Sequence, residues 1–401
     1  MLSASSAPVI RATLPVVGAH LNEITDRFYK RLFEAHPELL RNLFNRGNQA
    51  NGEQRQALAG SIAAFAQGLV DPDGPGVSGA RDLMITRIAH KHASLGVIAD
   101  QYPIVHKHLF AAIVEVLGDA VTPEVAAAWD EVYWLMAETL IAAEKGLYEE
   151  AEAPEGSVWR EMEIVERLQE TPDTVSFTLR RVDGRPAGTF RPGQYISVQV
   201  PLADGARQIR QYSLSSTPDQ ADWRITVKHR EDEPVPGEVS GRLHREARPG
   251  DVLTVSAPFG DMVLPEGDGP LLLASAGVGC TPMMAMLGRL VDEDSKREII
   301  VVHADRGPDQ HAHREEQRRL VEQLPQAQLH LWYEQPDART PEASVGRVDL
   351  DALALPKDVT VCLCGPLPFL RALRGDLLRR GVPATAIHYE VFGPDLWIAR
   401  G

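Results

Sequence analysis

The chain has 401 residues, 44% of them hydrophobic and 24% charged, which is ordinary for a soluble protein of two or three domains. Its formal net charge of −15 and the lack of a basic stripe exclude a nucleic-acid partner. The longest apolar runs contain glycine, proline and threonine, so we expect no membrane span, and we expect no signal peptide. Cys280, Cys362 and Cys364 lack metal-binding spacing, which favours a reducing cytoplasm. No feature implies an obligate protein partner.

The first 150 residues show the apolar periodicity of helices. Three stripes recur at helical spacing: Leu21, Ile24, Phe28 and Leu32; Gln54, Leu58, Ile62 and Phe65; and Trp129, Tyr133, Met136, Leu140 and Glu144. Residues 71–80 are rich in turn formers and predict a long loop between two helices. The acidic run 149–156, which also contains proline and glycine, predicts a linker.

Two further kinds of sequence pattern follow the linker. Short β-rich runs separated by turn residues predict a small antiparallel barrel, with strands at 175–179, 195–200, 223–228 and 252–255. After Pro265, apolar runs alternate with helical segments and predict a parallel α/β sheet, with strands at 271–274, 299–302 and 359–363. The predicted order is therefore helical, barrel, then α/β.

The barrel region contains a stretch suited to a flavin. In Arg210-Gln211-Tyr212-Ser213, the arginine offers a guanidinium to a pyrophosphate, the tyrosine offers an aromatic face, and the serine offers a hydroxyl. The turn at 191–194 places Tyr195 at the start of a strand nearby. Alone, this short run is equally typical of a solvated strand.

The α/β region contains two glycine turns at strand ends. Gly277-Val278-Gly279-Cys280-Thr281-Pro282 follows the first strand and opens a helix, which suits a diphosphate at the helix N-terminus. Cys364-Gly365-Pro366 ends a later strand, so both turns should converge at the same edge of the sheet. A plain strand-to-helix turn is the alternative, because the G-x-G-x-x-G pattern is incomplete.

Residues 157–401 thus resemble the ferredoxin-reductase-like flavoproteins. The resemblance implies FAD in the barrel, held by Tyr195, Arg210, Gln211, Tyr212, Ser213 and the run Gly237-Glu238-Val239-Ser240. It implies NADH or NADPH at the two glycine turns, and places Glu390-Val391-Phe392-Gly393-Pro394 against the flavin near the nicotinamide. Asp305 suits a ribose hydroxyl and Arg306 a phosphate, and we favour NADH.

The helical half contains a candidate haem ligand. His92 follows Ile85 and Ile88 on one apolar helical face, although a histidine so placed is also typical of a satisfied core residue. Gln54 and Leu58 share one face of an earlier helix. Further candidates for this pocket are Tyr29 on another helix and Phe44 in the corner at 43–46.

Residues 1–148 resemble a globin, and the whole chain resembles the flavohemoglobin family. The resemblance implies an all-α globin domain (1–148), a linker (149–156), an antiparallel β-barrel FAD domain (157–266) and an α/β parallel-sheet NAD(P)-binding domain (267–401). It makes His92 the ligand of the iron of haem b, with Tyr102 and Glu144 in a relay behind it and Tyr29 and Gln54 on the opposite side. It places Phe44 and Leu58 against the porphyrin, and Lys91 and Glu390 at the haem–flavin boundary.

Several alternatives remain open at this stage. Glu144 is also typical of a last-turn residue reaching solvent, and Lys91 and Glu390 of ordinary surface charges. His90, His106 and His108 are rival iron ligands, but His90 lies on a different helical face from His92, and the later pair lacks comparable partners.

The resemblance implies a nitric oxide dioxygenase, in which electrons from NAD(P)H pass through FAD to haem and bound O₂ oxidises NO to nitrate. The rivals are a peroxide or oxygen reductase of the same fold and a haem-based sensor of O₂ or NO.

Overall fold

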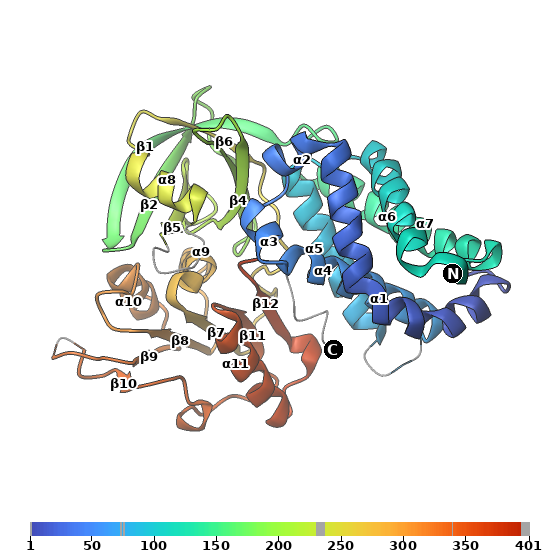
Figure 1. The fold of residues 1–401 in the computed structure, drawn as a ribbon. Coiled ribbons are helices and arrows are strands. Elements are labelled where there is room, and N and C mark those ends of the chain that lie inside the picture. The colour runs from blue at the N-terminus through green and yellow to red at the C-terminus, as the bar shows by residue number, and fades with distance from the viewer. Residues whose placement is uncertain (1, 73, 75–76, 230–236, 339, 394–401) are drawn as a thin grey trace. The chain divides into compact units, whose positions relative to one another are not determined.

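The computed structural model describes residues 2–72, 74, 77–229, 237–338 and 340–393. It divides into two compact units, one reaching Trp159 and including residues 199–209, the other made of residues 160–198 and 210–392. Figure 1 shows the helices of the first half, the antiparallel strands, and the α/β part in chain order, as predicted. No helix among the described residues is long and apolar enough to cross a membrane.

The first unit is built from helices around one apolar core. They are α1 (Ser6–Ala35), α2 (Pro37–Asn42), α3 (Arg46–Ala50), α4 (Glu53–Val70), α5 (Val77–Leu95), α6 (Tyr102–Leu117) and α7 (Pro123–Glu150), with 3-10 turns at Ala99–Gln101 and Gly118–Ala120. The predicted stripes supply its core, in which Ile24, Phe28, Leu32, Phe65 and Leu140 are buried.

Local sequence explains the helix boundaries. The Thr122 side chain caps the first turn of α7, and Pro123 occupies the first helical position, where its missing N–H leaves no hydrogen bond unmade. Helix α1 ends before Pro37, whose ring disfavours helical backbone at the preceding residue. The loop predicted over residues 71–80 is shorter than expected, because α5 already begins at Val77. Helix α7 also takes in the first two residues of the predicted linker.

The second part of the chain begins with a six-stranded sheet in the order β4-β3-β6-β1-β2-β5. Its strands are β1 (Trp159–Thr171), β2 (Thr174–Arg181), β3 (Tyr195–Pro201), β4 (Arg207–Ser213), β5 (Trp223–Lys228) and β6 (Val252–Ser256), with helix α8 (Glu238–Glu246) before β6. An antiparallel bridge between Leu214 and Ile225 joins the end of β4 to β5 and closes the sheet into a barrel.

The α/β part contains a parallel sheet in the order β10-β9-β8-β7-β11-β12. Its elements are β7 (Leu271–Ala276), α9 (Cys280–Asp292), β8 (Ile299–Asp305), α10 (Arg314–Glu322), β9 (Ala327–Tyr333), β10 (Ser344–Val345), β11 (Thr360–Cys364), α11 (Leu367–Arg379) and β12 (Ile387–Glu390), with 3-10 turns at Gly277–Gly279, Leu350–Ala352 and Ala384–Ala386. Alternate strand residues such as Leu271 and Leu273 pack against α9 and α10, which fixes one face of this sheet.

Candidate functional site

Three helices bring His92, Tyr102 and Glu144 together. The Nδ1 atom of His92 on α5 lies 2.8 Å from Glu144 Oε1 on α7, and the Tyr102 hydroxyl at the start of α6 donates to the same oxygen over 2.5 Å. Glu144 is buried, so these contacts satisfy a carboxylate that would otherwise be costly. Burial and the neighbouring Glu144 charge raise the pKa of Tyr102, which keeps the phenol protonated as a donor. The arrangement fixes one ring nitrogen of His92.

The turn after this histidine is held to the predicted linker. Tyr148, one helical turn beyond Glu144, donates from its hydroxyl to the Val97 carbonyl over 2.6 Å. Gly96 and Gly156 both have positive φ, and a Cβ at Gly96 would come within 2.9 Å of the Gly156 carbonyl oxygen. Only glycine fits this close approach without strain.

The opposite group of predicted residues also converges. The Tyr29 phenol is buried, which raises its pKa, and the nearby Gln54 and Gln49 side chains act in the opposite direction. The Tyr29 and Phe44 rings meet edge to face with centroids 5.8 Å apart. Leu58 packs against the same helical core. Gln49 on α3 was not predicted, because no local pattern separates it from an ordinary polar residue of a short helix.

The corner that contains Phe44 depends on another residue missed from sequence. The Gln208 amide donates to the carbonyls of Leu40, Arg41 and Phe44 over 3.2, 3.1 and 3.2 Å, and its oxygen accepts from the Arg46 backbone N–H over 3.1 Å. Gln208 is fully buried and belongs to the segment 199–209 that groups with the helical unit. The two N–H bonds of one amide, shared among three carbonyls, and its oxygen thereby hold the backbone of the corner together.

The rival histidines have other partners. His106 Nε2 lies 2.7 Å from Asp130 Oδ1, and the ring stacks on Phe110 with centroids 4.3 Å apart. His108 is buried and packs edge to face against His36. Lys91 precedes His92 on α5. Neither His106 nor His108 takes part in the contacts around Glu144 that the structure describes.

The predicted flavin residues lie on β3 and β4. The turn before Tyr195 requires Gly193, which has a φ of +108° and whose Cβ would lie 2.1 Å from the Met262 carbonyl oxygen. Gln211 donates to the Ser197 hydroxyl over 2.9 Å, and burial raises the pKa of Tyr212. The buried Ser213 hydroxyl has no hydrogen-bond partner among the described residues, which suits a ligand that supplies one.

The run predicted for the flavin pyrophosphate forms the N-terminus of α8. Gly237 precedes the first helical residue, Val239 is buried, and the Ser240 hydroxyl donates to the Gly237 carbonyl over 3.4 Å. The residues immediately before Gly237 lie outside the described part of the chain.

The two glycine turns converge as predicted. A Cβ on Gly279 would lie 2.3 Å from the Cys364 carbonyl oxygen, so the backbones of the two turns are in direct contact. Gly277 adopts a φ of +55° with open space around it. Cys280 and Cys364 are buried, which raises the pKa of both thiols and keeps them protonated. Val278, Thr281, Pro282, Gly365 and Pro366 lie in these same turns and the helix starts that follow.

Asp305 ends β8 beside this edge. Its Oδ1 accepts from the Arg306 backbone N–H over 2.8 Å, while its buried Oδ2 lies 3.6 Å from His303 Nε2 and has no hydrogen-bond partner among the described residues. The predicted C-terminal run begins at Glu390, the last residue of β12, and continues through Val391, Phe392 and Gly393. Pro394 lies outside the described residues.

Three family models match successive parts of the chain. A globin model matches residues 26–140, an oxidoreductase FAD-binding domain model matches residues 161–264, and an oxidoreductase NAD-binding domain model matches residues 273–375. The chain is 44% identical over 408 residues to a flavohemoprotein of Chromobacterium violaceum, with 98% of each chain covered. It is 40% identical over 411 residues to a flavohemoprotein of Rhizobium meliloti, covering 99% of this chain and 100% of the relative.

Solved structures give the same result. A flavohemoglobin from Malassezia yamatoensis with bound FAD and haem has a TM-score of 0.88 at 36% identity, covering 98% of this chain and 100% of that one. A flavohem-like FAD/NAD-binding domain of nitric oxide dioxygenase from Vibrio cholerae has a TM-score of 0.56 at 35% identity, covering 59% of this chain and 99% of that one.

Fold and site define a globin joined to an FAD- and NAD-binding oxidoreductase. The chain belongs to the flavohemoprotein family. Haem, FAD and a nicotinamide dinucleotide are its cofactors. The orphaned Ser213 hydroxyl, the backbone contact at Gly279 and the fixed Nδ1 of His92 are the features of this chain that fit them.

Proposed function

We propose that this protein is an NADH-dependent nitric oxide dioxygenase. When bound, the three cofactors supply the redox chemistry: NADH gives two electrons, FAD passes them singly to haem, and O₂ with NO yields nitrate. The nitric oxide dioxygenase of Vibrio cholerae, whose reductase domain is 35% identical, supports this activity. Three domains with the predicted ranges 1–148, 157–266 and 267–401, and a cytoplasmic location, belong to the same proposal.

The contact of His92 with Glu144 is the observation that supports the proposal most strongly. Nδ1 is engaged with Glu144 at 2.8 Å, so Nε2 is the ring nitrogen that would hold the iron. A carboxylate acceptor on Nδ1 strengthens the electron donation of the imidazole. This favours a haem that carries out oxygen chemistry over one that stores the gas reversibly. Tyr102 holds the carboxylate in place.

We assign Tyr29 and Gln54 as the residues that would donate hydrogen bonds to a ligand in the haem pocket. The Tyr29 hydroxyl, which burial keeps protonated, and the Gln54 amide are neutral hydrogen-bond donors that would stabilise developing negative charge in the pocket. Leu58 and Phe44 would contact the porphyrin.

In the reductase half, we assign Arg210, Tyr212 and Ser213 to the flavin and the N-terminus of α8 to its pyrophosphate. The turns at Gly277 and Cys364 would hold the dinucleotide. A buried carboxylate at Asp305 suits a ribose hydroxyl and repels a phosphate, which supports NADH over NADPH. Lys91 and Glu390 are proposed as charged residues of the haem–flavin boundary.

The test measures NO consumption, nitrate yield and NADH oxidation together in the purified holoprotein. One nitrate per NO, with NADH oxidised in step and a clear preference over NADPH, is the expected result. NADH oxidation that NO leaves unchanged would instead favour a peroxide or oxygen reductase, and gas binding without turnover would favour a sensor.

A further inference from the structure

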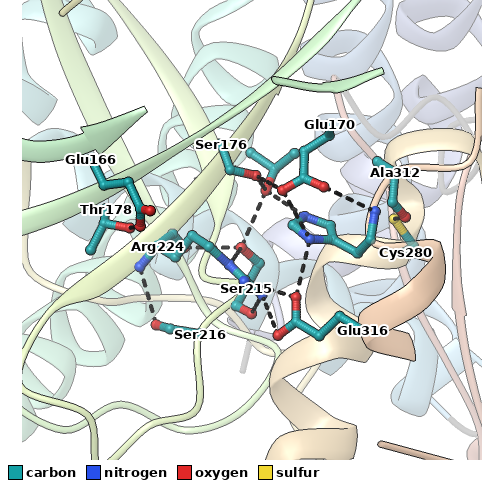
Figure 2. A network of polar contacts seen from close by, with 12 residues as sticks. Glu166, Glu170, Ser176, Thr178, Ser215, Ser216, Arg224, Cys280, Ala312 and Glu316 are labelled. Atoms are coloured by element: carbon teal, nitrogen blue, oxygen red, sulfur yellow. Dashed lines mark hydrogen bonds and ion pairs between the residues drawn. The ribbon is translucent and has the colours of Figure 1, made fainter. Parts of the chain in front are cut away.

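A buried histidine lies where α10 meets the barrel. His313 precedes α10 with a φ of +58°, in the left-handed region, and its side chain is only 1% exposed. Figure 2 shows a polar network in which Glu170, Ser176, Ser215, Arg224 and Glu316 are labelled; His313 contacts this network through Glu170 and Glu316. A non-glycine residue in this conformation and this degree of burial needs a specific set of contacts to hold it.

The first contacts of His313 are with barrel strands. Its Nε2 lies 2.8 Å from the Thr226 hydroxyl on β5, and its Nδ1 lies 3.3 Å from Glu170 Oε1 on β1. The backbone N–H of His313 donates to the other oxygen of Glu170 over 3.3 Å. Ser176 donates to Glu170 over 2.6 Å and lies 3.0 Å from Thr226, so the barrel side of the network is closed.

A second branch reaches the chain that follows the flavin motif. His313 Nδ1 lies 3.4 Å from Glu316 Oε2, and Arg224 donates to both oxygens of Glu316 over 2.8 and 3.0 Å. Arg224 also donates to the Ser215 carbonyl over 2.6 Å. Ser215 lies two residues beyond Ser213, so this branch ends beside the proposed flavin residues.

The neighbouring residue faces the nucleotide turn. The carbonyl oxygen of Ala312 accepts a weak hydrogen bond from the Cys280 thiol over 3.7 Å. Cys280 is the first residue of α9, directly after the turn at Gly277–Gly279. Residues 312–313 therefore contact the nucleotide turn through Ala312 and the barrel through His313.

We propose that His313 is a positioning residue for hydride transfer, because it fixes the nucleotide turn relative to the flavin strand. In that step a hydride leaves NADH, giving NAD⁺, and adds to the flavin, giving the reduced flavin anion. The inference rests on the first step of the proposed function and does not require NO as the substrate. A misplacement of about 1 Å between reacting groups can lower a rate about 100-fold. The contacts that residues 312 and 313 make with the nucleotide turn and with the barrel can therefore affect the rate of hydride transfer.

The experiment compares His313→Ala with His313→Asn in the FAD-loaded full-length protein. Asparagine tolerates left-handed backbone and keeps a donor toward Glu170, whereas alanine keeps neither property. Anaerobic stopped-flow measurements would follow flavin reduction by NADH. Hydrogen–deuterium exchange would follow the amides of residues 277–284, which is a readout independent of turnover.

We expect His313→Ala to lower the limiting rate of flavin reduction about 10-fold. The NADH concentration giving half of that rate should change less, amide exchange in 277–284 should accelerate, and His313→Asn should restore most of the rate. Glu315→Gln is the matched control, because Glu315 is an exposed residue of the same helix turn that pairs only with Arg314 among the described residues. It should behave as the unmodified protein.

Unchanged flavin reduction and exchange in His313→Ala would overturn the proposal. If that variant fails to retain FAD, Glu170→Gln decides, because it keeps the His313 ring in place and removes the charge of the carboxylate that the ring and its backbone N–H contact. Unmodified flavin reduction and amide exchange in Glu170→Gln would also overturn the proposal. The assay contains neither O₂ nor NO, so a protein that fails to consume NO can still pass it.

Discussion

The proposed haem site and the nucleotide turn are built by opposite means. His92, Tyr102 and Glu144 come from three helices, and the contacts that form the site are between their side chains. The nucleotide turn is made of backbone, where Gly279 touches Cys364 and no side chain would fit. A site of the first kind fails when a side chain is removed, and a site of the second kind fails when one is added.

The largest effect should follow from removing His92. We expect His92→Ala to abolish NO turnover, because the iron loses its only proposed axial ligand from the protein. NADH reduction of FAD should persist, since the backbone turns are untouched. An absorption spectrum and a flavin-reduction trace check both statements, and a normal Soret band in the variant would contradict the ligand assignment.

The converse change adds a methyl group to the nucleotide turn. Gly279→Ala places Cβ 2.3 Å from a backbone oxygen that cannot move alone, so we expect NADH-dependent flavin reduction to fall about 100-fold. Gly277→Ala is the matched control, because its Cβ meets open space and costs only the strain of a positive φ, about 1 kcal/mol. Equal losses in the two variants would show that steric contact is not what limits this turn.

A smaller effect is expected from the residue behind the ligand. Glu144→Gln keeps the shape of the side chain and removes its charge, so we expect NO turnover to fall about 10-fold while haem is retained. The iron–histidine stretching frequency of the ferrous protein should fall as well. A frequency that does not change would mean that Glu144 does not tune the imidazole.

The smallest effect concerns pH and the network around α10. Burial alone would raise the pKa of Glu316, but hydrogen bonds from His313 and Arg224 outweigh it and lower the pKa from its ordinary value of 4.5 to about 2. A carboxylate whose pKa is lowered in the folded state stabilises the fold at pH values above its pKa in the unfolded state. This stabilisation is lost as the pH falls from about 4.5 toward about 2.

Glu316→Gln should therefore be less stable than the unmodified protein at pH 6, by no more than about 1 kcal/mol, and the difference should shrink as the pH is lowered to about 3. Urea unfolding followed by flavin fluorescence gives both values. A difference that grows on acidification would reverse the sign of the argument.

Sequence patterns identified the elements whose periodicity is strong. The stripes of α1, α4 and α7 were predicted because apolar residues recur at the helical period. Strands β7, β8 and β11 were predicted because each is a continuous apolar run, and most of their residues are buried. Strand β1 was missed since its Glu and Arg residues alternate with apolar ones in a way that also fits an exposed segment. The extent of β8 was underestimated, because its final residues are polar.

The candidate site was predictable where a residue type is unusual in its place. A histidine on an apolar face and a glutamate on an apolar stripe both stand out, and the structure brings His92 and Glu144 together. Gln49, Gln208 and His313 lie in polar stretches, and the fold brings each of them near residues distant in sequence, so no local signal separates them from solvent-facing residues.

The glycine pair after the proximal histidine has a practical consequence for anyone dividing the chain into modules. Gly156 contacts Gly96, and its backbone also hydrogen-bonds the Tyr148 phenol, so the last residues of the predicted linker are packed parts of the globin. An excised haem protein ending at residue 148 would leave this packing incomplete. Splices that exchange reductases between relatives should therefore be made after Gly156, where only two residues precede β1.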